Sequence, residues 1–165
     1  MEIAQHFEDE EQQEYRIAMA ELLDLKKEQI AAIMMIGYRL YEQGRLKEAA
    51  KIFEGLAVLD QRNAYVNGIL GSIYQKQGQH EPALERYNRA LALFSYDTNA
   101  LTNRGEILLK LGRFQEAAED FKQAFQLDPE RKDPAANRAW FLVNIVREAM
   151  TLAKQEATEE IKEKI

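Results

Sequence analysis

Apolar and small residues recur along the middle of the chain with helical spacing and at a fixed period. The stretch GYRLYEQGRLKEAAKIF, residues 37–53, reads as a helix, a break at Gly44 and a second helix. Several of its positions return twice at steps of 34 residues, as the series Gly37/Gly71/Gly105, Gly44/Gly78/Gly112, Ala49/Ala83/Ala117 and Phe53/Tyr87/Phe121. Positions locked to one period in this way mark a repeat array.

The period divides the array into three repeats, residues 30–63, 64–97 and 98–131. The first helix of each repeat carries an apolar stripe at helical spacing: Ile33, Ile36, Gly37 and Leu40; Leu70, Gly71 and Tyr74; Leu101, Gly105 and Leu108. The second helix carries a matching stripe: Ala49, Phe53 and Leu56; Ala83, Tyr87 and Ala90; Ala117, Phe121 and Ala124. The pattern predicts an all-α protein with two helices in each repeat and no strands.

The two glycine series are expected to have different roles. Glycine inside a helix costs roughly 0.5–1 kcal/mol relative to alanine, so the Gly37 series indicates that two helices approach closely and need its small size. The Gly44 series lies where each first helix must end, a position that favours a left-handed residue. Pro82 falls in the first turn of its helix, and Asp133-Pro134 predicts the cap and first turn of a last helix.

The two ends of the chain each predict one more helix, which makes about eight in all. A helix over residues 9–28 would carry one apolar stripe, formed by Tyr15, Ala18, Met19, Leu22 and Leu25. This helix could cap the first repeat, form a dimer contact or serve as a docking arm. Residues 134–157 are apolar around most of the helix, so we expect burial on more than one side, against this chain, a second copy or a client. The charged segment TEEIKEKI that follows is expected to fray.

The 165 residues carry a net charge of −6, and its distribution is uneven. Residues 1–29, the N-terminal arm, hold 9 acidic and 3 basic side chains, whereas residues 30–131 hold 13 of each and residues 132–165 hold 6 of each. No basic stripe suited to nucleic acid is present. The opening residues lack the basic and then apolar run of a secretory signal, and no apolar run is long enough to insert into a membrane.

Catalytic and metal-binding chemistry has no evident site in the sequence. Cysteine is absent, which excludes disulfides and thiol catalysis. The two histidines, His6 and His80, have no second ligand at helical spacing, so each is expected to be solvated. Neither a nucleophile-elbow serine nor a glycine-rich phosphate loop occurs. We therefore expect a protein that is not an enzyme and that needs no metal or cofactor.

The repeat resembles the tetratricopeptide repeat over residues 30–131. The resemblance rests on glycine at the eighth position, alanine at the twentieth, an aromatic residue at the twenty-fourth and LDP at residues 127–129. It implies antiparallel helix pairs that stack into a right-handed superhelix with a concave groove. Because one such repeat cannot bury its own apolar faces, stability comes from its neighbours.

The first helices would line that groove and could bind an extended peptide. The peptide-binding candidates are Met34, Tyr38, Tyr41, Tyr65, Ser72, Gln75, Asn99, Thr102 and Leu109. Tyrosine suits this role because its rigid ring ends in a hydrogen-bonding hydroxyl, although the same tyrosines could instead cover the N-terminal helix as core. The Lys and Asn clamp of repeats that grip heat-shock protein carboxylates is absent, since Met34 and Tyr38 stand at its first positions.

The first half of the chain also resembles the class II chaperones of bacterial type III secretion. The shared features are Leu40-Tyr41 before Gly44, Glu48-Ala49, Phe53, LAVLD at residues 56–60 and GSIYQ before Gly78. The resemblance implies a cytoplasmic, non-enzymatic holdase that keeps hydrophobic translocator proteins soluble before export. The alternatives are a scaffold that joins folded partners and an assembly factor of another secretion or pilus system.

The same resemblance implies a homodimer formed through the N-terminal helix. The expected contact residues are Tyr15, Met19, Leu22 and Leu25. An apolar contact between two such helices should resist salt. Because acidic residues crowd the same arm, salt should relieve their repulsion and tighten a contact of one arm with another.

Overall fold

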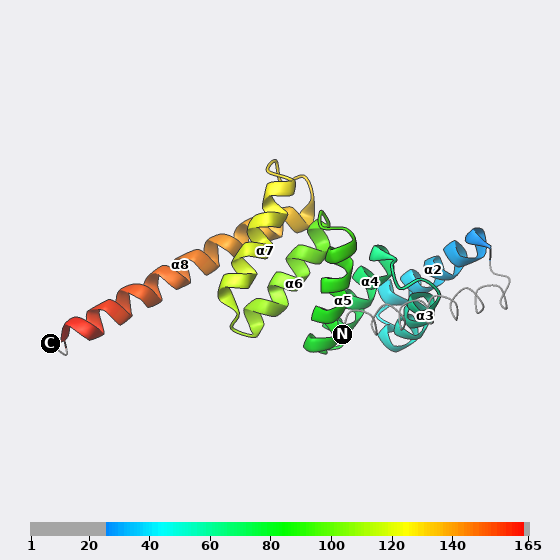
Figure 1. Ribbon diagram of the computed structural model, residues 1–165, viewed down its shortest axis with the longest axis horizontal. Helices are drawn as coiled ribbons and strands as arrows, with labels where there is room; N and C mark the ends of the chain where they lie inside the picture. Colours follow the sequence, from blue (N-terminus) through cyan, green and yellow to red (C-terminus); the bar gives the residue numbers. More distant parts are fainter. Residues whose placement is uncertain (1–25, 164–165) are drawn as a thin grey trace, which may run out of the picture. The chain divides into compact units, whose positions relative to one another are not determined.

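Seven helices and no strand occur in the part of the chain that the computed structural model describes, residues 26–163, with side chains described for residues 26–155. The helices are α2 (Lys27–Glu42), α3 (Leu46–Leu59), α4 (Ala64–Lys76), α5 (His80–Leu93), α6 (Thr98–Lys110), α7 (Phe114–Leu127) and α8 (Pro134–Glu163). Figure 1 shows three helical hairpins, α2 with α3, α4 with α5 and α6 with α7, and α8 is the longest helix. The predicted all-α class is confirmed, whereas most of the helix predicted for residues 9–28 lies outside the described residues.

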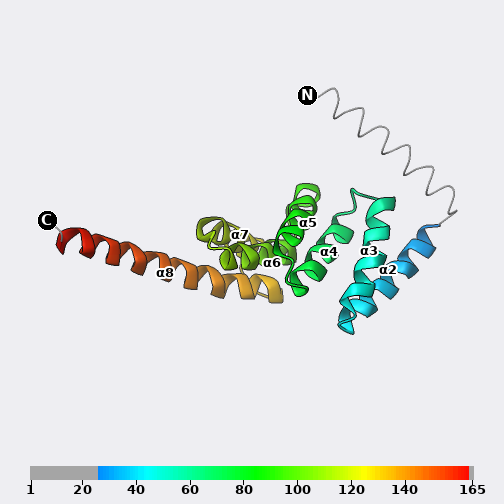
Figure 2. The ribbon, with the colours of Figure 1, turned by 90° about the horizontal axis from the view of Figure 1, so that it is seen from below.

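The chain divides into two compact units, Met1–Leu93 and Phe94–Ile165. In the first unit, α3 packs against both α2 and α4, and α4 packs against α5, so the helices follow one another as neighbours (Figure 2). In the second unit, α7 packs against α6 and α8, and α8 also contacts α6. Each unit thus buries apolar surface between consecutive helices, as a repeat array must.

The glycines inside the first helices lie directly against the aromatic rings that recur with the same 34-residue period. A Cβ atom built on Gly37, Gly71 or Gly105 would come within 2.8, 2.7 or 2.6 Å of the ring of Phe53, Tyr87 or Phe121, respectively. All three rings are completely buried. The predicted role of these glycines is confirmed, because the two helices of each pair are too close for any side chain at that position.

Replacing Gly71 by alanine is expected to destabilise the protein by roughly 1–3 kcal/mol, the usual cost of overpacking a core. The ring of Tyr87 cannot move aside easily, because it is buried and its hydroxyl is hydrogen-bonded. Urea denaturation measures this change. Gly55→Ala is the matched control: Gly55 lies within α3 with nothing within 4 Å of its added Cβ, so this change should stabilise by about 0.5–1 kcal/mol. Equal effects at the two sites would contradict the packing role.

The turns between paired helices are closed by glycines in the left-handed conformation. The φ angles of Gly44, Gly78 and Gly112 are 74°, 75° and 73°. In the first of these turns, the N–H of Arg45 donates to the carbonyl of Leu40 over 2.9 Å, a bond that spans the glycine. The same bond closes the other two turns. These features form a Schellman motif, which confirms the predicted function of the series.

Side-chain caps fix where several helices begin. Asn63 accepts a hydrogen bond from the N–H of Val66 at the start of α4, and Asp97 accepts one from the N–H of Ala100 at the start of α6. Asp133 accepts one from the N–H of Ala135, over 2.7 Å, immediately before α8. The predicted Asp133-Pro134 cap is therefore confirmed, as is Pro82 in the first turn of α5.

Two details of the helices differ from the prediction. The sequence pattern places Ile36 on the packing stripe, but the residue is half exposed, because the stripe is centred on Gly37 and the preceding residue lies about 100° around the helix. The last helix continues to Glu163 and does not end near residue 157. Residues 135–163 contain neither glycine nor proline, and glutamate, lysine and alanine all favour helix, so nothing stops it earlier.

Up to residue 155, the last whose side chain is described, the long helix α8 is buried along one side. Its buried residues are Ala135, Ala136, Ala139, Val143 and Val146, which face the rest of the second unit. The large side chains of Phe141, Ile145 and Leu152 are more than half exposed. Among the residues that the structure describes, α8 is thus not buried on more than one side.

Candidate functional site

Four side chains from α2 and α4 form one surface of the first unit, which we call the tyrosine face: Tyr38, Tyr41, Tyr65 and Lys76. The ring centroids of Tyr38 and Tyr41 are 6.0 Å apart on α2. Lys76 reaches across from α4 and places its Nζ atom 4.0 Å from the centroid of the Tyr41 ring. This cation–π contact links the first helix of one repeat to the first helix of the next.

The rings of the tyrosine face remain accessible to solvent. Tyr38 is 39% exposed and Tyr65 is 50% exposed, while Tyr41 is partly buried against the core of the first unit. Their environment is intermediate between core and free surface, as suits side chains that bind a further chain. The alternative, in which the same rings cover the N-terminal helix, concerns residues outside those that the structure describes.

Burial raises the pKa of the Tyr65 hydroxyl above its ordinary value, and the neighbouring Tyr38 adds a smaller effect in the same direction. An ordinary tyrosine already titrates near pH 10. Tyr65 is therefore neutral at physiological pH, and its hydroxyl can both donate and accept a hydrogen bond. The tyrosine face thus offers apolar rings that end in hydroxyls, beside the positive charge of Lys76.

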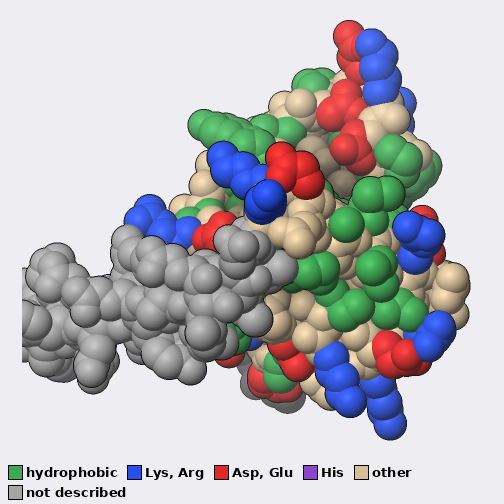
Figure 3. All heavy atoms as spheres, turned by 90° about the vertical axis from the view of Figure 1, so that its right-hand side faces the viewer, with side chains coloured by type: hydrophobic (Ala, Val, Ile, Leu, Met, Phe, Trp, Pro, Cys, Tyr) green, Lys and Arg blue, Asp and Glu red, His purple; other side chains and the backbone are tan. Residues whose placement is uncertain are grey.

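Exposed hydrophobic side chains continue beyond the tyrosine face on α2 and α3. Met35 of α2 and Val58 of α3 are examples. Figure 3 shows hydrophobic side chains gathered, with charged ones around them, on the side of the molecule where α2 and α3 lie. Apolar patches of this kind commonly mark interaction sites.

The other candidates of the first unit contribute differently. Met34 is partly buried against the core. Ser72 and Gln75 point their polar ends at the buried Tyr87: its hydroxyl donates to Gln75 Oε1 over 2.7 Å and lies 3.0 Å from Ser72 Oγ. The sequence offered a signal for this network, since Tyr87 stands where the other two repeats have phenylalanine, and a buried hydroxyl needs partners.

The three candidates of the second unit are not equivalent. Asn99 is exposed and Leu109 is partly exposed. Thr102 is completely buried, and its Oγ1 donates to the carbonyl of Ala135 at the start of α8 over 3.2 Å. We therefore remove Thr102 from the candidate site, because α8 takes the place that a peptide would need.

Sequence reasoning missed a buried ion pair in the second unit. Arg104 of α6 donates from Nε and Nη2 to the two carboxylate oxygens of Asp120 on α7, over 2.7 and 2.6 Å. The Asp120 side chain is only 7% exposed and that of Arg104 is 24% exposed. This two-point contact fixes α6 against α7 beside the Gly105–Phe121 contact.

Within residues 26–163, no cluster of histidine, aspartate and glutamate is arranged to hold a metal ion. The helices of this part of the chain also lack the combination of length and hydropathy that a membrane span requires.

Family models identify the repeats. Two models of the tetratricopeptide repeat match residues 34–100 and 70–140, and together they span residues 34–140, which is 107 of the 165 residues. The chain belongs to the tetratricopeptide repeat family. The predicted class of repeat is therefore confirmed.

Relatives of this tetratricopeptide protein differ in how much of their length the match covers. Low calcium response locus protein H of Yersinia pseudotuberculosis is 24% identical over 156 residues, which are 87% of this chain and 90% of that protein. The DnaJ homolog subfamily C member 7 homolog of Schizosaccharomyces pombe is 27% identical over 121 residues, but this chain spans only 25% of its length.

Several solved structures similar to the tetratricopeptide protein come from type III secretion. A type III secretion complex from Aeromonas hydrophila has a TM-score of 0.74 and 27% identity, covering 80% of this chain and 89% of that one. PcrH in complex with the chaperone-binding region of PopD has a TM-score of 0.72 and 25% identity, covering 76% and 96%. The predicted resemblance to translocator chaperones is confirmed.

Proposed function

We propose that this tetratricopeptide protein is a cytoplasmic, non-enzymatic chaperone that holds an extended segment of a hydrophobic type III secretion translocator. The tyrosine face carries the proposal, because it supplies exposed aromatic rings, hydroxyls and a cation on two consecutive first helices. A preformed surface of this kind lowers the ordering cost of binding an extended segment. Holding such a segment also removes an aggregation hazard from solution.

The similar structures support this choice of client. PcrH was solved with the chaperone-binding region of PopD, and it covers three quarters of this chain. Protein H of Yersinia matches this chain over nine tenths of its own length. A general scaffold is the second candidate, and the match to a small part of the much longer DnaJ homologue favours it.

Co-purification separates the two candidates. The full chain would be isolated from its native cells, and its partners identified by mass spectrometry. We expect a membrane-inserting translocator, and limited proteolysis of the complex should leave a short, protected client segment. A scaffold would instead retain a folded partner domain that resists the protease as a whole, and that result would contradict the chaperone function.

Replacing Tyr65 by alanine is expected to weaken binding of that client segment by roughly 1–3 kcal/mol, the range for an aromatic interface anchor. Because half of the ring is exposed, the free energy of unfolding should change much less than for a core residue. Fluorescence anisotropy with the segment as a labelled synthetic peptide measures the affinity, and thermal unfolding measures the stability.

Tyr96→Ala is the matched control for this change. Tyr96 is 66% exposed, lies between α5 and α6 and is not part of the tyrosine face. Its loss should leave the affinity unchanged. A large fall in melting temperature for Tyr65→Ala, with unaltered affinity, would show that the ring is core and has no binding role.

A further inference from the structure

The exposed side of α8 carries a regular series of residues, which we call the α8 seam. All of them are exposed, and they follow one another at alternate steps of four and three residues from the first residue of the helix: Pro134, Arg138, Phe141, Ile145, Glu148 and Leu152. Alternate steps of three and four residues are the spacing by which a helix contacts a partner helix in a coiled coil. The series therefore indicates that another helix covers this side of α8.

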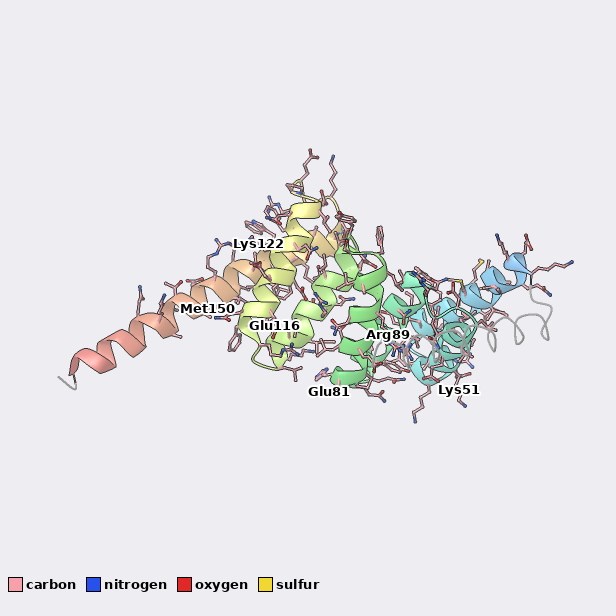
Figure 4. All side chains as sticks on the ribbon, viewed as in Figure 1. Lys51, Glu81, Arg89, Glu116, Lys122 and Met150 are labelled. Atoms are coloured by element: carbon pink, nitrogen blue, oxygen red, sulfur yellow. The ribbon has the colours of Figure 1, made fainter. Side chains whose placement is uncertain are left out.

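The α8 seam lies opposite the buried side of the helix. Val143 is buried, and Ile145 is two residues further on, which places it about 200° around the helix. Lys122 of α7 and Met150 of α8 line one groove, so Met150, labelled in Figure 4, marks the side of α8 that faces α7. Leu152 of the seam is again about 200° away from Met150. The seam is therefore a second face of α8, separate from the one that packs on α7.

The α8 seam is complementary to itself in the reverse direction. Its members form three pairs that are symmetric about position 143: Phe141 with Ile145, Arg138 with Glu148, and Pro134 with Leu152. Two of the pairs are apolar, and the third joins opposite charges. When two such helices lie antiparallel about a two-fold axis at the level of position 143, each pair forms twice, once on either side of the axis.

We propose that the α8 seam binds the α8 seam of a second copy of this chain in this antiparallel arrangement. A second copy fits the pattern because every seam residue then meets a complementary one. Phe141, Ile145 and Leu152 are 53%, 60% and 54% exposed in the single chain, so the contact removes three large apolar side chains per copy from water. The charged pairs lie further from the axis and fix the register of the two helices.

Contacts within the chain already hold two of the seam side chains in place. The ring of Phe141 packs edge-on against Trp140, with the ring centroids 4.8 Å apart. Arg138 donates from Nε and Nη2 to side chains of α6 over 2.6 and 2.8 Å, and it is still 45% exposed. Because a guanidinium has five N–H donors, Arg138 can also donate to a carboxylate of a second copy. Side chains that are held in advance lose less entropy on binding.

Replacing Ile145 by glutamate should raise the dissociation constant of the dimer at least about tenfold, because two-fold symmetry places a charge in the apolar centre twice. A single seam makes a small interface, so the native dimer should be in equilibrium with the monomer at micromolar concentrations. Light scattering coupled to size exclusion on the full chain, from about 1 to 100 μM, covers this range. Thr151→Glu is the matched control, since it adds the same charge to an exposed position of α8 outside the seam.

Disulfide cross-linking tests the direction and register of the two helices. The chain has no cysteine, so introduced cysteines are its only thiols. A mixture of the Phe141→Cys and Ile145→Cys variants of the full chain, oxidised with glutathione disulfide, should form a linked dimer, because these positions face each other. Each variant alone should link more slowly, since equal positions of the two copies are offset by about 6 Å along the axis.

Several results would overturn the proposal. One is a native chain that stays monomeric at about 100 μM. Another is a dimer that Ile145→Glu does not weaken, or that Thr151→Glu weakens equally, because the contact would then lie elsewhere on the chain. A third is Ile145→Cys that links to itself faster than to Phe141→Cys, which would show a parallel pair.

Discussion

Replacing Phe121 by alanine should destabilise the protein by about 3–5 kcal/mol, the largest effect of any single change considered for this fold. Phe121 is completely buried on α7, and its ring lies against Gly105 on α6. Because glycine has no side chain, nothing on that side can relax into the cavity left by the ring. Urea denaturation followed by circular dichroism measures the loss.

Phe114→Ala provides the matched control, since it removes the same side chain from the same helix. Phe114 is at the start of α7 and is 49% exposed. Its replacement should cost only about 1 kcal/mol, because much of its surface already contacts water. Similar losses for the two variants would show that the glycine–aromatic contact is not what stabilises the third repeat.

Replacing Asp120 by alanine should cost about 3 kcal/mol, because it leaves the guanidinium of Arg104 without its two-point partner in a largely buried site. Removing only the carboxylate of this largely buried pair costs more than replacing both of its side chains by apolar ones. The double variant Arg104→Met/Asp120→Leu should therefore recover most of the stability that the single change loses. Denaturation of the three proteins under the same conditions gives the comparison.

The exposed pair of Arg113 and Glu116 is the control for this second prediction. It likewise joins an arginine to a carboxylate through two short contacts, but its side chains are 47% and 58% exposed. Glu116→Ala should cost less than about 1 kcal/mol, as surface ion pairs do. A small loss for Asp120→Ala, or a double variant as unstable as the single one, would contradict the account of a buried pair.

The sequence predicted those parts of the fold that repeat. The predicted contact of Gly71 with Tyr87 and the predicted turn at Gly44 were correct. In each series the same physical requirement, close helix approach or a left-handed residue, recurs every 34 residues. Three instances of a pattern exclude coincidence where one would not. The position of the tyrosine face on α2 and α4 followed from the same phase.

Features that occur once could not be predicted in this way. At the positions equivalent to Arg104 and Asp120, the second repeat has Leu70 and Arg86. The repeat pattern therefore does not predict the ion pair. The repeat period places Thr102 in the groove, but its burial depends on where α8 packs. That helix follows the last repeat, so the period says nothing about its position. The contact of Lys76 with Tyr41 depends on the distance between two first helices, and a sequence pattern does not give that distance.

The central claim, that the tyrosine face holds an extended client segment, is tested most directly by cross-linking. A photoreactive benzoyl-phenylalanine would replace Tyr65 in one variant of the full chain and Tyr96 in another, each with the co-purified client segment as a synthetic peptide. We predict that light cross-links the peptide at position 65 and not at position 96, as detected by mass spectrometry. Cross-linking at position 96 alone, or none at position 65 while the peptide is bound, would contradict the claim.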